Sequence, residues 1–109
     1  MILNDLLLTA GDVFLLEWEV VNPLGPFQAR QAIVLDVWGS YYFWPTWTQE
    51  VGWGYRGFNP RSQTTQTILE FEWPAGAGSG DNIIFWAALL AENSWDVIGQ
   101  VDFQAFSFR

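Results

Sequence analysis

Apolar and polar residues alternate along several stretches of this chain with the two-residue period of a β-strand. The alternation is clearest over residues 13–21, where Glu17 and Glu19 separate apolar residues. The pattern places these apolar residues on the core face: Phe14, Leu16, Trp18 and Val20. Gly, Pro, Asn and Asp end each stretch, and no 3.6-residue helical period persists. Strands are therefore predicted at Ile2–Leu8, Val13–Val21, Arg30–Trp38, Tyr41–Trp44, Thr64–Trp73, Asn82–Ala91 and Val97–Phe108.

Turn signals at intervals of about 8–12 residues, between about seven short strands, are typical of an antiparallel two-sheet β-sandwich. The immunoglobulin-like strand order is preferred. It places the second and fifth strands side by side in one sheet, and the third, sixth and seventh strands in the other. A jelly roll or a small barrel is the alternative architecture. With 109 residues, the chain is predicted to form a single domain over residues 1–109.

This strand order makes the two outer faces of the sandwich unlike each other. The outer face of the first sheet is acidic and carries Glu17, Glu19, Glu70 and Glu72. The outer face of the second sheet is apolar and carries Val34, Trp38, Ile84, Trp86, Ala88 and Leu90. An apolar patch of this size is rarely left in water, so we expect segment 41–58 or another protein surface to cover it. The closing strand, Gln100–Arg109, has few charges to guard its edge against pairing with another strand.

The same alternation predicts the core. In the fifth strand it places on the core face Thr67, Leu69, Phe71 and Trp73. It places on the solvent face Gln66, Ile68, Glu70 and Glu72. Trp18 and Phe71 are predicted to face each other between the sheets. The residues expected to pack with them are Leu16, Leu35, Phe85 and Leu89. Gly99 is predicted to form a bulge or bend in the last strand.

Aromatic residues crowd into residues 38–58, so this segment is predicted to dominate either packing or binding. It runs into a Gly-rich connection, residues 45–62, that has weak strand signal and exceeds the usual loop length of about 4–6 residues. The candidate interface or ligand platform is Trp38, Tyr42, Trp44, Trp47, Trp53, Tyr55 and Trp86. A flap that closes the core and a protein interface are two interpretations of the aromatic segment.

Carbohydrate stacking is the third interpretation. It requires at least two exposed and roughly coplanar rings among Trp44, Trp47, Trp53 and Tyr55. The polar neighbours that would bind sugar hydroxyls are Gln49, Glu50 and Asn59.

Composition argues against several classes of function. A net charge of −8, with four Arg and no Lys, argues against nucleic acid as a partner. No apolar run approaches the roughly 20 residues of a membrane helix, so membrane insertion is not expected. The chain has neither Cys nor His, which excludes disulfides, thiolate metal sites and a histidine-based nucleophilic triad. Glu70 and Glu72 have the spacing of a glycosidase pair, but their predicted face is open to water, so no enzyme is expected.

No cofactor is predicted. Ca²⁺ is the one metal considered, because four aspartates fall in or near turns: Asp12, Asp81, Asp96 and Asp102. No D-x-[DN]-x-[DN]-G run is present, and Asp is common in turns for its own hydrogen bonding.

Several short sequence motifs resemble those of a known kind of module. They are Ala10-Gly-Asp-Val-Phe14, Val21-Asn-Pro23, the run from Val34 to Trp47, Phe71-Glu-Trp-Pro74 and Phe85-Trp-Ala-Ala-Leu89. Together they resemble an immunoglobulin- or fibronectin-like accessory sandwich that recurs in secreted and cell-surface multidomain proteins of environmental bacteria. The resemblance implies export and a non-catalytic role, and it carries no functional residue across. Because the N-terminal residues have no basic region typical of a signal peptide, a leader is expected on a longer parent chain or to have been removed.

These observations predict a non-catalytic extracellular module that acts as a spacer, adhesin or self-assembling subunit. Its expected partner is another protein, a neighbouring domain or a second copy of itself. A carbohydrate-binding module is the alternative.

Overall fold

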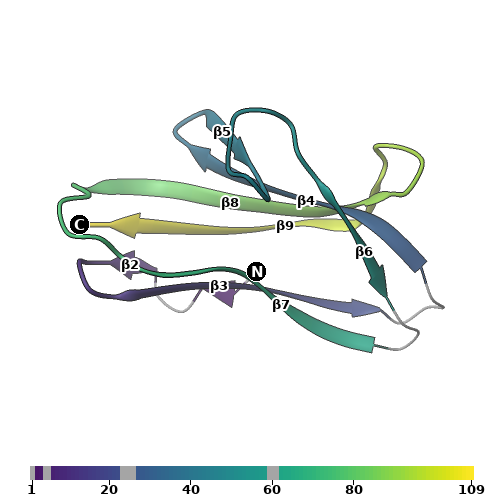
Figure 1. Ribbon diagram of the computed structural model, residues 1–109, viewed down its shortest axis with the longest axis horizontal. Helices are drawn as coiled ribbons and strands as arrows, with labels where there is room; N and C mark the ends of the chain where they lie inside the picture. The colour runs from purple at the N-terminus through teal and green to yellow at the C-terminus, as the bar shows by residue number, and fades with distance from the viewer. Residues whose placement is uncertain (1, 4–5, 23–26, 59–61) are drawn as a thin grey trace.

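The computed structural model describes residues 2–3, 6–22, 27–58 and 62–109, which form two β-sheets packed in two layers (Figure 1). The shorter strands are β1 (Ile2–Leu3), β2 (Leu7–Leu8), β5 (Ser40–Phe43) and β6 (Gly54–Phe58). The longer strands are β3 (Val13–Asn22), β4 (Phe27–Val37), β7 (Ser62–Glu72), β8 (Gly80–Ala91) and β9 (Val97–Phe108). Residues 23–26, between β3 and β4, lie outside the described residues.

The strand order confirms the predicted immunoglobulin-like sandwich. The smaller sheet has the order β1-β3-β7, and the larger sheet has the order β2-β9-β8-β4-β5, with β6 also paired to β4. The predicted second and fifth strands, β3 and β7, are therefore neighbours, and β4, β8 and β9 lie together in the other sheet. All described pairings are antiparallel except β2 with β9. The predicted first strand is divided into β1 and β2, which belong to different sheets.

Strand β6 is the element that the sequence predicted least well. Two glycines lower its strand propensity, yet its residues pair in register with residues 27–31 of β4. Gly54 is required there, because a Cβ atom at this position would lie 2.8 Å from the ring of Trp44. The close approach of this backbone to an indole ring explains why a weak strand-former occupies the position.

Arg56 connects β6 to the smaller sheet. Its guanidinium donates hydrogen bonds to the Gln31 side-chain oxygen at 3.1 Å and to Thr64 Oγ1 on β7 at 2.8 Å. The same group lies 4.9 Å from the ring centre of Phe58 and 5.8 Å from that of Trp18. Burial lowers the pKa of Arg56 from its ordinary value. One end of the sandwich is therefore closed by a hydrogen-bonded cation and not by apolar side chains alone.

The core is organised around the ring of Phe14. Ring centres lie 4.9 Å away for Phe71, 5.4 Å for Phe106 and 5.9 Å for Phe85. Four predicted core residues are buried: Leu16, Trp18, Phe85 and Leu89. Leu35 packs against this cluster while remaining partly exposed.

A β-bulge makes the predicted facing of β7 wrong over part of the strand. Leu16 pairs with Leu69, but the next residue of β3, Glu17, pairs with Thr67, so Ile68 is the extra residue. Ile68 is buried in the core, whereas Thr67 is exposed, which reverses the facing predicted for both residues. A single inserted residue shifts the two-residue period for the rest of the strand, and alternation alone does not reveal it.

Phe71 does not face Trp18 as predicted. It lies opposite Phe14 on the neighbouring strand of the same sheet, and Trp18 lies opposite Gln66. Phe71 is 40% exposed, since it stacks on the edge of the core instead of filling its centre.

The predicted irregularity at Gly99 is present. Gly99 has a φ of 76°, and the β8–β9 register shifts between Ala87 and Leu89.

Candidate interaction surface

The outer face of the larger sheet includes four adjacent cross-strand rows of side chains. The Arg30 row contains Tyr55, Arg30, Leu90 and Val97. The alanine row contains Ala32 and Ala88. The aromatic row contains Phe43, Val34, Trp86 and Phe103. The Asp36 row contains Tyr41, Asp36, Ile84 and Ala105. Neighbouring rows are two residues apart along each strand, which is roughly 7 Å.

The aromatic row is the most prominent apolar feature of this face. Trp86 is 36% exposed and Phe103 is 58% exposed, and their ring centres lie 5.4 Å apart at an angle of 40°. The indole N–H of Trp86 points to Asp36 Oδ2 at 3.4 Å, a long hydrogen bond that constrains the ring weakly. Next to these large rings, the two alanines form a row of small side chains.

A second aromatic group surrounds Arg30. The guanidinium carbon lies 4.8 Å from the ring centre of Trp53 and 4.7 Å from that of Trp95. Its Nε donates to the backbone oxygen of Glu92 at 3.0 Å. Trp95, which is 61% exposed, was not among the predicted site residues because it lies in a turn far from the aromatic segment in sequence. Only the approach of the β8–β9 turn to Arg30 brings it to this surface.

Two predicted platform residues are partly buried and pack against the core instead. Trp44 and Trp47 pack against the buried cluster, and the ring of Trp47 contacts Phe85 edge-on at a centre distance of 5.8 Å. Tyr42 is half-buried and lies opposite Leu35, on the inner side of the sheet. Part of segment 41–58 therefore acts as a flap over the core, and it leaves Trp86 and Phe103 uncovered.

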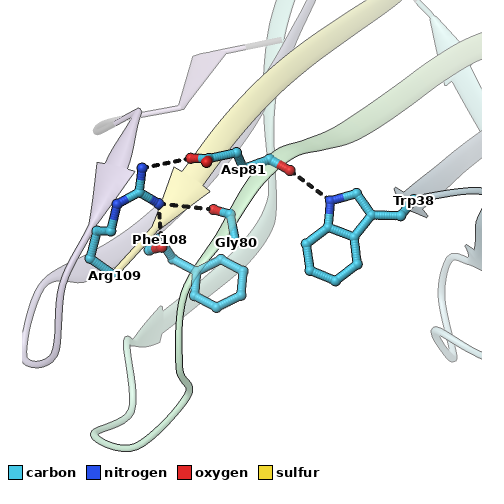
Figure 2. Close-up of polar contacts among 5 residues, drawn as sticks. All are labelled: Trp38, Gly80, Asp81, Phe108 and Arg109. Carbon is cyan, nitrogen blue, oxygen red and sulfur yellow. Dashed lines mark hydrogen bonds and ion pairs between the residues drawn. The ribbon is translucent and has the colours of Figure 1, made fainter.

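Trp38 does not lie on the outer face as predicted, because β4 ends at Val37. It occupies a turn with a φ of 49°, is 67% exposed, and donates its indole N–H to the backbone oxygen of Asp81 at 2.7 Å (Figure 2). Asp81 also forms an ion pair with Arg109 at 2.7 Å. These contacts hold the C-terminal residue and the turn after β4 to the start of β8.

The geometry required for sugar stacking on the predicted platform is not met. Of the four rings considered, Tyr55 is exposed, but Trp53 beside it is only half-exposed and lies at 82° to it. Trp44 and Trp47 are partly buried against the core, so no two of the four make an exposed coplanar pair. Of the predicted polar neighbours, Gln49 and Glu50 are exposed, and Asn59 lies outside the described residues.

The free edge of β9 is better guarded than its composition indicated. Strand β2 pairs with Ser107 and Phe108 only. Along the strand before them, the Phe103 N–H donates to Asp102 Oδ1 at 2.8 Å, and Gln104 Nε2 donates to the carbonyl oxygen of Ala105 at 3.0 Å. These side chains satisfy backbone groups that an added strand would need. The face of the sheet is therefore a better candidate for contact than this edge.

Charge is divided between the two outer faces as predicted. Glu17, Glu19, Glu70 and Glu72 lie on the outer face of the smaller sheet, as the β3–β7 register shows. Within the four rows of the larger sheet, the charged residues are Arg30 and Asp36, whose formal charges cancel.

Each of the four candidate Ca²⁺ ligands has a hydrogen-bond partner close by. Asp12 accepts from the backbone and side chain of Thr9, and Asp96 accepts from Ser94. Asp81 binds Arg109, and Asp102 caps Phe103. Among the residues that the structure describes, no group of three acidic side chains is placed to hold a metal ion.

Comparison with protein-family models, curated proteins and solved structures finds no significant match to this chain. The described part of the chain contains no helix with the length and apolar character needed to cross a membrane.

Proposed function

We propose that this domain is a non-catalytic module that binds another protein through the outer face of its larger sheet. The observation that carries the proposal is the exposure of Trp86 and the neighbouring Phe103 on a face whose two charges cancel. Large aromatic side chains in such a position are the usual anchors of protein interfaces. The absence of His and Cys, and the solvent-facing glutamates, support a non-catalytic role.

An extracellular setting is part of the same proposal. It is supported by the resemblance of the packing and turn motifs to those of exported sandwich modules. Such a module would act as a spacer, an adhesin or an assembling subunit of a longer protein.

The test compares three forms of the domain as immobilised baits for proteins of the source cell surface. They are the unchanged domain, the double variant Trp86→Ser/Phe103→Ser, and the control Val21→Ser. Val21 is an exposed apolar residue of the smaller sheet, so the control makes the same kind of change on the other face. We expect the unchanged domain and the control to retain the same protein and the double variant to lose it. Equal retention by all three would show that this face is not the binding surface.

Carbohydrate binding is the second candidate function, supported by the exposed rings of Trp95 and Tyr55 beside Arg30. Tryptophan fluorescence titrated with a polysaccharide panel tests it. A change that Trp95→Ala abolishes and Trp86→Ser preserves would favour this alternative.

A further inference from the structure

We infer that the protein bound by this face is a second copy of the same chain. In the proposed dimer the two larger sheets pack face to face about a two-fold axis. The axis lies midway between the two packed sheets and runs across the strands. It is parallel to the cross-strand rows and passes between the alanine row and the aromatic row. The inference rests on the proposed function, because it names the partner of the same face.

On β4 and β8 the shape of the face is complementary to itself about this axis. Rotation by half a turn about the axis gives the partner. Each row of one copy then lies over the partner's row that is equally far from the axis on the opposite side. Trp86 would then lie over the partner's Ala88, and Ala88 would lie under the partner's Trp86. On β4, Val34 meets the partner's Ala32 in the same way. A row of large side chains beside a row of small ones is what a two-fold interface needs in order to fill space without clashes.

The two charges of the face are complementary about the same axis. The axis crosses β4 at Ile33, and Arg30 and Asp36 each lie three residues from it on opposite sides. Arg30 would therefore face the partner's Asp36, and the symmetry would create this pair twice. Within the described residues Arg30 makes no ion pair with a carboxylate. Its guanidinium group donates a hydrogen bond to the Glu92 carbonyl and lies near two tryptophan rings.

The distribution of the remaining charge also permits this dimer. The net charge of −8 opposes association of copies in general. However, the four glutamates of the smaller sheet would lie on the two far sides of the dimer, with both sandwiches between them. Packing through the acidic face would instead bring like charges together.

The size of the face predicts a weak dimer. Four rows about 7 Å apart on four strands about 4.8 Å apart cover an area near the low end of protein interfaces, roughly 600 Å² per partner. Association should therefore depend on concentration in the ordinary experimental range and should not be permanent.

The experiment exchanges the large and small residues across the axis. In Ala88→Trp the introduced ring would collide with the partner's Trp86, and in Trp86→Ala each copy would leave a gap over the partner's Ala88. An equimolar mixture of the two variants can form a dimer in which each ring meets an alanine. Sedimentation velocity, with one variant carrying a fluorophore, measures homodimers and mixed dimers separately.

We expect each variant alone to dimerise about tenfold or more weakly than the unchanged chain, and the mixture to regain dimers. Val21→Ala should leave dimerisation unchanged. Both target residues are on the outer face, and circular dichroism checks that each variant folds. If Ala88→Trp does not fold, the truncation Trp86→Ala by itself must still weaken the dimer.

A strict monomer at every concentration would overturn the inference, as would a dimer that both variants leave unchanged. Neither result would decide the proposed function. The bait comparison tests whether this face binds any protein of the source cell surface and gives its own answer.

Discussion

The tryptophans of this chain differ in role according to what surrounds each ring, and Trp18 is the clearest case of a core tryptophan. It is 4% exposed, and the Arg56 guanidinium lies near its ring. Its neighbours are held by two sheets and cannot collapse fully into the space left by truncation. Trp18→Ala is therefore expected to lower the free energy of unfolding by about 3–5 kcal/mol, measured by urea denaturation. Val51→Ala, in an exposed loop position, should change it by less than about 0.5 kcal/mol. A small effect of Trp18→Ala would contradict the packing described.

The ion pair between Asp81 and Arg109 can be tested through the titration of the Asp81 carboxyl group. Its pKa lies below the ordinary value of 3.8, mainly because Arg109 donates a hydrogen bond to the carboxylate, with Ser107 contributing a second. A carboxyl whose pKa is depressed by folding stabilises the folded state above its unfolded pKa, and that contribution is lost as the pH falls through the folded pKa. The carboxyl chemical shift, followed by NMR, should titrate below pH 3.8. Arg109→Gln should raise the midpoint, and Arg30→Gln should not move it. An unchanged midpoint in Arg109→Gln would mean that the ion pair does not persist in solution.

Strand β7 shows how one residue decides the behaviour of an element. The bulge turns Ile68 into the core and Thr67 to solvent, in opposition to simple alternation. We expect Ile68→Ala to destabilise the domain by about 2–5 kcal/mol and Thr67→Ala to change its stability by less than about 0.5 kcal/mol. Thermal and urea unfolding of the two variants would measure both. The reverse order of effects would support the unbulged strand.

At the scale of elements, the sequence predicted best what depends on local pattern. Alternation in residues 13–21 correctly placed Leu16 and Trp18 in the core, and the two-sheet sandwich followed from the number of strands and the spacing of turns. It failed where tertiary contacts override the local signal. β6 forms a strand because it pairs with β4, despite its two glycines. Ile68 faces the core because of a β-bulge in the β3–β7 pair.

The candidate surface was predicted only in part, for a related reason. Trp86 was identified because a strand apolar on both faces must present one of them outward. Trp44 and Trp47 were assigned to the surface on composition, although the flap folds them against the core. Trp95 and Phe103 reach the surface through a distant turn and an edge strand. No local pattern distinguishes these positions.

At the scale of the whole molecule, the sandwich separates charge from apolar surface. The acidic face would repel other copies in most orientations, while the face with cancelling charges would permit the proposed orientation. Association should therefore depend on the sign of Arg30 and Asp36 and not on net charge alone. Reversing the charge of Arg30 or of Asp36 separates the effect of this charge pair from the effect of net charge.

Two charge-reversed variants test whether Arg30 faces the partner's Asp36. Arg30→Glu would place a carboxylate over the partner's Asp36, and Asp36→Arg would place two guanidinium groups together, so each variant alone should dimerise more weakly than the unchanged chain. Mixed in equal amounts, the two variants restore an opposite-charge pair at both symmetry-related positions, and mixed dimers should form in preference to either homodimer. Sedimentation of the mixture measures this directly. Net charge gives the opposite expectation for Asp36→Arg, because that variant is the least acidic and general repulsion would be weakest in it. Stronger self-association of Asp36→Arg, with no preference for mixed dimers, would show that general repulsion governs association and would remove the support for the facing of Arg30 and Asp36.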